Sequence, residues 1–253
     1  MYEAAEVSIR TGSDTERTFS YRLMRPDPDL DAAPYPLVVF LHGAGERGSD
    51  NQRQLKYLPE WMASERNRAD HPCFLIALQC PEGESWAPFD RSNDMAPVPG
   101  PPQDPLLAVV RAIDLLADSE PIDRTRIYLT GLSMGGYGAW RLASLHPDRF
   151  AAVVPICGGG DPVEADALTG MQIWAVHGTE DSVVPERLSR VMVEAVRDAG
   201  GIVRYSPLEG VPHDSWTPAY RHLGVIQWMF RKRLAPEAEG PVPVELDEPE
   251  PEA

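Results

Sequence analysis

Short runs of apolar residues recur along the chain, separated by longer segments in which apolar residues return at helical spacing. Continuous apolar runs of this kind indicate strands that are buried on both faces, as in a parallel sheet. The buried runs are Leu37–Leu41, Cys73–Leu78, Ile127–Thr130, Ala151–Ile156 and Ile173–Val176. One more strand is predicted after them, at Val203–Pro207.

A different pattern, with a period of two, lies near the N-terminus. Glu6–Ile9 and Thr18–Leu23 alternate apolar and polar residues on either side of Thr11-Gly12-Ser13-Asp14, which is a turn-forming segment. This arrangement predicts an antiparallel hairpin at the edge of the sheet.

Helical periodicity fills the intervals between the strands. Asp104 is placed to cap a helix that continues to Leu116. A second helix is predicted from Pro185 to about Ala199, and a third over roughly Thr217–Lys232. The alternation of strands and helices predicts an α/β fold with a mostly parallel central sheet and helices on both faces. Without internal repeats, residues 1–234 are expected to form one domain.

The net charge of −16, from 39 acidic and 23 basic residues, changes the list of expected partners. Nucleic acids and anionic membranes bind basic surfaces, so neither is expected to bind this chain. Part of the charge lies in residues 235–253, which are rich in Pro and Glu and contain no aromatic residue. Such a segment cannot bury enough apolar surface to offset ordering, so we expect a disordered tail, either solubilising or partner-binding.

Three cysteines, Cys73, Cys80 and Cys157, show no Cys-x-x-Cys spacing. We therefore expect neither a disulfide framework nor a zinc site. The N-terminus lacks a basic segment followed by an apolar stretch, as a secretory signal would have. No segment approaches the roughly 18 uninterrupted apolar residues of a membrane span. These features predict a cytoplasmic protein; an oligomer is possible but not indicated.

The candidate chemistry centres on the segment Gly131-Leu132-Ser133-Met134-Gly135-Gly136. This Gly-x-Ser-x-Gly pattern lies between a predicted strand and a helical segment that begins at Tyr137. A sharp turn between the two would expose the Ser133 hydroxyl at the end of the sheet, and glycines at 131 and 135 would remove steric clashes there. Ser133 is therefore the expected nucleophile.

A serine hydroxyl needs an imidazole to take its proton and a carboxylate to orient that imidazole. In the chain order Ser, Asp or Glu, His, only His213 and His222 lie late enough to be the base. We assign the base to His213, in a loop after the last strand, because His222 lies inside a predicted helix. Glu180 and Asp181 compete for the acid, and we choose Asp181. His177 is expected to be a structural loop residue.

The negative charge that develops on the substrate oxygen needs two backbone N–H donors. One is expected from Met134, the residue after the nucleophile. The other is expected from the loop His42-Gly43-Ala44-Gly45-Glu46-Arg47-Gly48, with Ala44 as our choice and Gly45 as the alternative. His42 is expected to anchor this loop by hydrogen bonds.

Residues that could contact the substrate are less sharply defined. Gly45 is a candidate for substrate contact, and Arg47 either faces the substrate or forms a local ion pair with Glu46. Trp86 and Trp216 either line the acyl or alcohol pocket or belong to the core. Trp86 lies in the Pro-rich connection 81–103, which we expect to form one wall of the cleft.

The length of another connection bears on access to the site. Only 14 residues separate Ile156 from Met171, too few for a lid domain. We therefore expect an open site.

Five segments in this order resemble a branch of the α/β-hydrolase superfamily. They are the loop 42–48, residues 79–86, Gly131–Trp140, His177–Pro185 and His213–Trp216. That branch includes predicted peptidases, feruloyl and polyhydroxyalkanoate-depolymerase-like esterases, phospholipase/carboxylesterases and dienelactone hydrolases. The resemblance covers roughly residues 20–232 and implies the α/β-hydrolase fold. Dienelactone hydrolases use a cysteine nucleophile, whereas position 133 is serine.

The sequence therefore predicts a serine hydrolase that cleaves small carboxylic esters through an acyl-enzyme intermediate. No metal and no cofactor are implied. Two alternatives stay open: a serine peptidase with the same triad, and a catalytically silent hydrolase fold used for binding.

Overall fold

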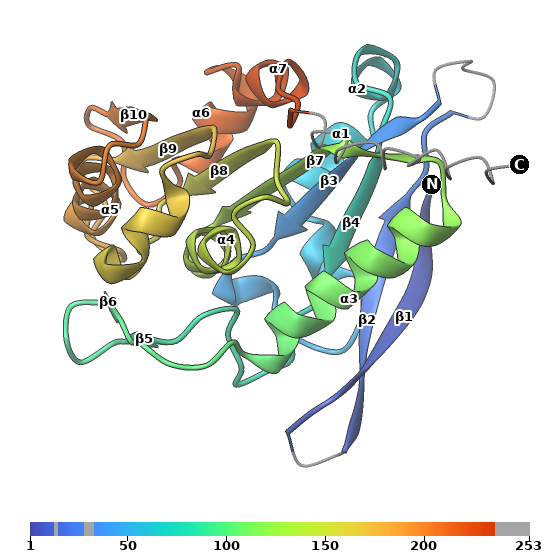
Figure 1. Cartoon of the computed structure of the whole chain (residues 1–253), viewed down its shortest axis with the longest axis horizontal. Helices are drawn as coiled ribbons and strands as arrows, with labels where there is room; N and C mark the ends of the chain where they lie inside the picture. The colour runs from blue at the N-terminus through green and yellow to red at the C-terminus, as the bar shows by residue number, and fades with distance from the viewer. Residues whose placement is uncertain (13–14, 28–32, 236–253) are drawn as a thin grey trace, which may run out of the picture.

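The computed structural model describes residues 1–12, 15–27 and 33–235 (Figure 1). At its centre is an eight-stranded sheet in the order β1-β2-β4-β3-β7-β8-β9-β10. The first two pairings in this order are antiparallel, and all the others are parallel. The strands are β1 (Tyr2–Arg10), β2 (Glu16–Met24), β3 (Tyr35–Leu41), β4 (Phe74–Leu78), β7 (Ile122–Leu132), β8 (Ala152–Ile156), β9 (Ile173–Gly178) and β10 (Val203–Leu208).

The mostly parallel sheet and its N-terminal antiparallel hairpin confirm the predicted architecture. Every residue of β3, β4 and β8 is buried, which explains why these strands are continuous apolar runs in the sequence. β1 and β2, by contrast, alternate in burial because the hairpin covers the sheet edge with only one face packed.

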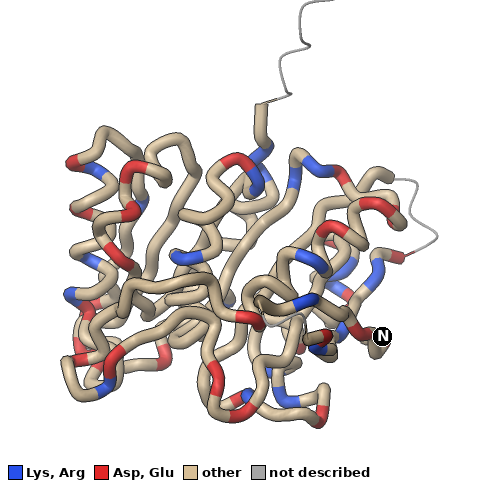
Figure 2. Tube along the Cα trace, turned by 60° about the horizontal axis from the view of Figure 1, so that its bottom comes forward, with Lys and Arg blue, Asp and Glu red and all other residues tan. Residues whose placement is uncertain are grey.

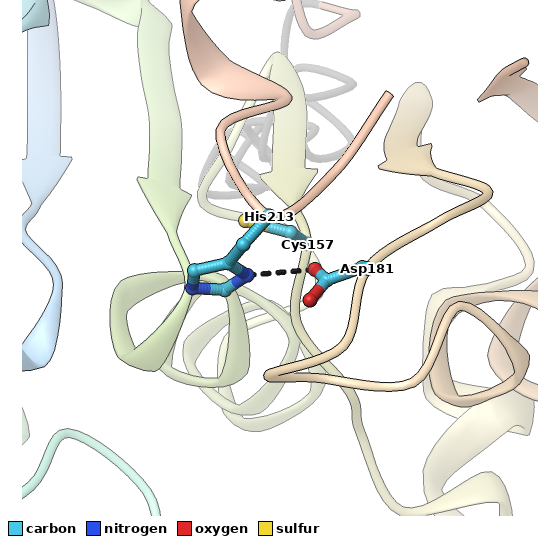
Figure 3. A group of neighbouring side chains, drawn as sticks. All are labelled: Cys157, Asp181 and His213. Atoms are coloured by element: carbon cyan, nitrogen blue, oxygen red, sulfur yellow. Dashed lines mark hydrogen bonds and ion pairs between the residues drawn. The ribbon is translucent and has the colours of Figure 1, made fainter. Parts of the chain in front are cut away.

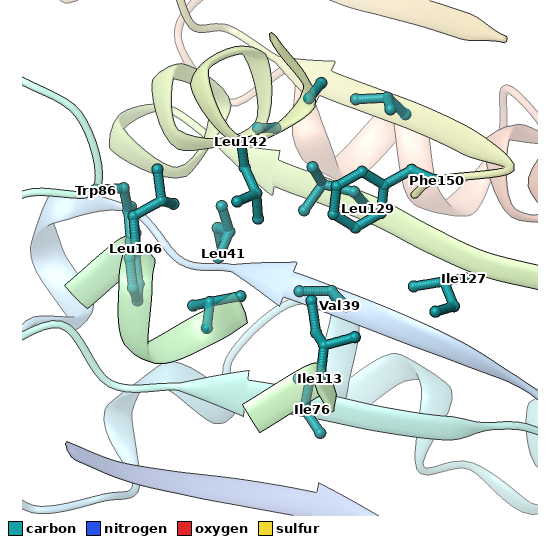
Figure 4. Close-up of a cluster of buried hydrophobic side chains, with 14 of the residues drawn as sticks. Val39, Leu41, Ile76, Trp86, Leu106, Ile113, Ile127, Leu129, Leu142 and Phe150 are labelled. Atoms are coloured by element: carbon teal, nitrogen blue, oxygen red, sulfur yellow. The ribbon is translucent and has the colours of Figure 1, made fainter. Parts of the chain in front are cut away.

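Helices cover both faces of the sheet (Figure 1). α3, α4 and α5 pack on one face, where Leu106, Ile113 and Leu142 meet Leu41 and Leu129 of the strands (Figure 4). α1, α6 and α7 pack on the other face. The helices are α1 (Leu58–Met62), α2 (Glu65–Asp70), α3 (Asp104–Ser119), α4 (Met134–Leu145), α5 (Arg187–Asp198), α6 (Trp216–Arg221) and α7 (Val225–Phe230).

The predicted cap at Asp104 is wrong. Gln103 precedes the first turn of α3, and Asp104 is the first residue of the helix. The Asp104 carboxylate instead accepts a hydrogen bond from Arg17 at 2.6 Å, which ties α3 to β2. A carboxylate in the first turn still complements the helix dipole.

The single helix predicted over roughly 217–232 is also wrong, because the segment forms two short helices. α6 ends before His222, and α7 begins after Gly224, whose φ is 79°. A left-handed residue cannot continue a right-handed helix, so Gly224 turns the chain between the two.

The Pro-rich connection 81–103 contains a small hairpin that the sequence did not predict, β5 (Phe89–Asp90) with β6 (Ala96–Pro97). The connection between β8 and β9 holds only a 3₁₀ turn at Pro162–Leu168, in agreement with the expectation of no lid domain there. Among the described residues, no helix has the length and apolar character to cross a membrane. Residues 236–253, where the acidic tail is predicted, lie outside the described residues.

Candidate active site

Ser133 lies at the sharp turn between β7 and α4. Its backbone has φ 53° and ψ −119°, an unusual conformation for a serine. Neighbouring backbone leaves no space for side chains at the flanking glycines. A Cβ on Gly131 would lie 2.2 Å from the Gly135 carbonyl oxygen, and a Cβ on Gly135 would lie 1.9 Å from the Leu41 carbonyl oxygen. The two glycines are therefore required by the turn, as the sequence pattern predicts.

The structure brings Ser133, His213 and Asp181 into one hydrogen-bonded chain. His213 Nε2 lies 3.1 Å from Ser133 Oγ. His213 Nδ1 lies 2.7 Å from Asp181 Oδ2, the contact drawn as a dashed line in Figure 3. The carboxylate can only accept, so Nδ1 carries the proton and Nε2 is free to accept from the serine hydroxyl. This arrangement can deprotonate the serine.

Asp181 is held as an anion by a dense set of donors. Its Oδ1 accepts from the amides of Val183 and Val184 at 2.8 and 2.9 Å. Burial acts to raise the pKa of Asp181, but hydrogen bonds from His177, His213 and these amides hold that pKa well below its usual range. The side chain is therefore ionised and fixed in orientation at neutral pH.

The rival candidates for acid and base lie away from this chain of hydrogen bonds. Glu180 is exposed, and only its backbone amide is tied down, by a bond to Val211 O. His222 is exposed at the end of α6.

The loop after β3 lies against the nucleophile turn. His42 is fully buried, and burial lowers its pKa to about 4, so it is neutral. Its Nε2 accepts from Cys80 N at 2.9 Å, and its Nδ1 donates to Gly43 O at 2.6 Å. His42 thus anchors the loop, as expected. Ala44 and Met134 each begin a helical turn, so neither amide N–H has an intrahelical acceptor.

Of the two alternatives for Trp86, the one that places it in the substrate pocket is wrong. Its side chain is fully buried, and its indole N–H donates to His42 O at 2.9 Å. Its ring packs edge-on against His42, with ring centroids 5.1 Å apart. Trp86 therefore packs under the loop after β3, on the side of the core, and is not accessible to a substrate.

The prediction of a local ion pair between Glu46 and Arg47 is also wrong, because no salt bridge joins these two side chains among the described residues. Glu46 is buried, and desolvation raises its pKa. Arg47 Nε is buried without a hydrogen-bond partner in the described part of the chain. Gly45 is exposed in the same loop. Substrate contacts by Arg47 and Gly45 stay predictions.

Trp216 lies beside the candidate base. Its ring packs edge-on against His213, with ring centroids 5.2 Å apart. It also packs against the Tyr57 ring in a tilted arrangement, with centroids 5.4 Å apart. Tyr57 was not predicted as part of the site; its φ of 65° is rare for a bulky residue and has no clear signal in the sequence. A substrate contact by Trp216 stays a prediction.

The connection 81–103 packs over the start of α4 and α5. Tyr137 donates its hydroxyl proton to Met95 O at 2.7 Å, and Arg187 pairs with Asp94. Residues of this connection line a pocket together with Tyr137 and Arg141. None of Ser133, Asp181 and His213 lines this pocket, so the role of the connection as a wall of the catalytic cleft stays a prediction.

Cys157, at the end of β8, was not predicted near the site. One ligand atom each of Cys157, Asp181 and His213 lie within 4.8 Å of one another (Figure 3). These residues do not fit a metal ion, because Asp181 and His213 already bond to each other. Burial also raises the pKa of the Cys157 thiol, so it carries its proton and is a poor ligand.

Comparisons with known proteins identify related hydrolases. Residues 102–214 match the dienelactone hydrolase family. The chain is 31% identical over 175 residues to the protein named "Putative esterase NocK" from Nocardia uniformis subsp. tsuyamanensis, covering 67% of this chain and 47% of that protein. The chain spans about half the length of this relative.

Two solved structures extend the comparison. The crystal structure of a thermostable esterase is 41% identical with a TM-score of 0.80, covering 92% of this chain and 63% of that one. The acylaminoacyl peptidase of Pyrococcus horikoshii has a TM-score of 0.64 at 17% identity, covering 94% of this chain and 43% of that one, and shows the fold alone. The chain belongs to the α/β-hydrolase superfamily, in the branch that contains serine esterases.

Proposed function

We propose that this chain is a serine carboxylic-ester hydrolase that works through an acyl-enzyme. Ser133 Oγ attacks the ester carbonyl carbon while His213 Nε2 takes the hydroxyl proton. Asp181 accepts a hydrogen bond from His213 Nδ1–H throughout, stays ionised and stabilises the imidazolium that forms. The amides of Ala44 and Met134 donate to the oxygen on which negative charge develops.

The tetrahedral intermediate then breaks down towards products. The C–O bond to the alcohol breaks, and His213 returns the proton to the leaving alkoxide. A water molecule enters, gives its proton to His213 Nε2 and attacks the acyl carbon. The acid leaves, and the proton returns to Ser133. Each step uses this chain's own side chains and water, and no cofactor.

The single observation that carries this proposal is the hydrogen-bonded chain Ser133–His213–Asp181, with distances of 3.1 and 2.7 Å. The 41% identity to a thermostable esterase favours esters over amides as substrates. The short connection between β8 and β9 suits an open site and thus short-chain or aryl esters.

The test is hydrolysis of a p-nitrophenyl ester series from acetate to decanoate, with a feruloyl ester and a peptide anilide. Wild type is compared with Ser133→Ala. Turnover of short or aryl esters that is lost in the variant supports the proposal. Anilide cleavage without ester turnover would make the chain a peptidase. Inactivity on every substrate, with no labelling by a fluorophosphonate probe, would make it a binding protein.

A further inference from the structure

His177, near the end of β9, is fully buried and makes contacts through both ring nitrogens. Its Nδ1 lies 2.7 Å from Ser189 Oγ on α5. Its Nε2 lies 3.1 Å from Asp181 Oδ2 and 2.9 Å from Val184 O. The oxygen Asp181 Oδ2 is thus shared between two imidazoles, those of His177 and His213.

The protons in this network can be counted from the partners. Ser189 has one hydroxyl proton, and its Oγ lies 2.7 Å from Gly158 O, which can only accept. That proton therefore lies on the bond to Gly158, and Ser189 Oγ must accept from His177 Nδ1–H. On the other side of the ring, both neighbours of Nε2 are acceptors, so Nε2 must also carry a proton.

From this count we infer that His177 is a buried imidazolium, the counter-ion of Asp181, and a positioning residue that keeps His213 neutral. The catalytic part of this inference rests on the proposed function. A buried charge is stable only when paired and hydrogen-bonded, and His177 meets both conditions.

The other titratable groups around the pair do not supply a second counter-ion. Burial raises the pKa of the Cys157 thiol, just after β8, and of the Tyr137 phenol on α4, so both are neutral. On the loop after β10, Asp214 is exposed and accepts from Thr217.

The charged groups of α5 are engaged elsewhere. Arg187 pairs with Asp94 at the surface. Glu186 pairs with Arg190 and accepts from Tyr205. Among the described residues, His177 is therefore the positively charged group in contact with Asp181, apart from His213 when it is protonated.

A positive charge on one imidazole opposes protonation of the other. Because Asp181 already binds the His177 imidazolium, it attracts a proton to His213 less strongly than an isolated carboxylate would. His213 then stays in its neutral form, which is competent as a base, to lower pH. For charges a few ångströms apart in a protein, we expect the His177 charge to move the acid limb of the pH profile down by about one pH unit.

The first test does not depend on activity. In the wild-type chain with ¹⁵N-labelled histidine rings, NMR at pH 7 should show both nitrogens of His177 bearing protons, with the His177→Gln spectrum or through-bond correlations giving the assignment. One unprotonated ring nitrogen on His177 would overturn the inference, whether or not the chain hydrolyses esters.

The second test is the pH profile of kcat/KM with p-nitrophenyl acetate. The acid limb should move up by about one pH unit in His177→Gln, and in the same direction in Ser189→Ala, which removes the acceptor at Nδ1. His222→Gln, the same change at an exposed histidine, should leave the limb in place. A lower kcat/KM with an unmoved limb in both variants would reduce His177 to a structural role. If His177→Gln does not fold, the pH profile of Ser189→Ala and the wild-type NMR spectrum still test the inference.

Discussion

Ser133 holds a conformation that costs on the order of 1–3 kcal/mol for a residue other than glycine. The turn keeps it there through backbone hydrogen bonds: its amide donates to Ile156 O at 2.9 Å, and its carbonyl accepts from Gly136 and Tyr137. The strain lifts Oγ out of the backbone and towards His213 Nε2. A flexible serine loop would place the hydroxyl less reproducibly.

At this site, Ser133→Ala should reduce kcat by roughly 10⁴–10⁶-fold, because in the described part of the chain Ser133 is the hydroxyl placed against His213 Nε2. The melting temperature should change little. Steady-state kinetics with p-nitrophenyl acetate and a thermal melt check both parts. Retention of most activity would remove Ser133 from the mechanism.

The choice of base can be tested by comparing two histidines. His213→Ala should reduce kcat/KM about as much as Ser133→Ala, since the two residues act as a unit. His222→Ala should have a small effect, because His222 is exposed at the end of α6. If His222→Ala were the more damaging change, the base would have to be reassigned.

The steric requirement at the turn predicts a large effect of one methyl group. Gly135→Ala would place Cβ 1.9 Å from Leu41 O, so the backbone of β3 or α4 must shift. We expect a loss of at least about 3 kcal/mol in the free energy of unfolding, measured in urea. Gly170→Ala, where nothing lies within 4 Å, is the matched control and should stay close to wild type.

Single residues show where sequence reasoning succeeds and where it stops. Chain order and loop position select Asp181 and His213, because each follows directly from a strand end. The sequence does not predict the burial of Trp86, because an aromatic residue in a loop can either cover the core or line a cleft. His177 contacts Asp181, four residues later, because the chain turns back after β9. The sequence holds no unambiguous signal for this turn.

Among the elements, the buried strands were the easiest to predict and helix ends the hardest. A strand covered on both faces must be apolar throughout, and β3, β4 and β8 follow this rule. Helix breaks depend on local conformation instead. The apolar residues of α6 and α7 keep one helical spacing across the break because both helices pack on the same face of the sheet.

The break itself predicts the behaviour of a substitution at Gly224. With φ at 79°, alanine there should cost about 1 kcal/mol in the free energy of unfolding, whereas Gly224→Asn should cost less because asparagine tolerates the left-handed region. Urea unfolding of both variants measures this. Equal stability of Gly224→Ala and wild type would mean that the two helices can merge into one.

On the scale of the whole molecule, Asp and Glu are interspersed with Lys and Arg along the described trace (Figure 2). The net charge of −16 is therefore spread over the surface as well as placed in the C-terminal residues. Individual buried carboxylates, rather than this diffuse charge, are expected to dominate the response of stability to acid.

Asp181 makes that response testable. Its pKa is depressed in the folded chain, so it contributes stability above the unfolded pKa of about 4, and this stability is lost as the pH falls further. Below pH 4, the free energy of unfolding should therefore fall less steeply with falling pH in Asp181→Asn than in wild type. The two slopes should differ by up to about 1.4 kcal/mol per pH unit. Urea unfolding between pH 5 and pH 2 measures the slope. The exposed Asp148→Asn is the control, and identical slopes in the two variants would contradict the prediction.

The candidate site draws on the ends of β3, β7, β9 and β10. Ser133 and His213 are separated by 80 positions in the sequence, and Asp181 and His213 by 32. No contiguous fragment of the chain carries it. Contacts between such distant segments form late when a chain folds, because closing long loops is unfavourable until much of the sheet is in place. A partly folded intermediate should therefore be inactive, and recovery of turnover during refolding should report the final assembly of the sheet rather than its first collapse.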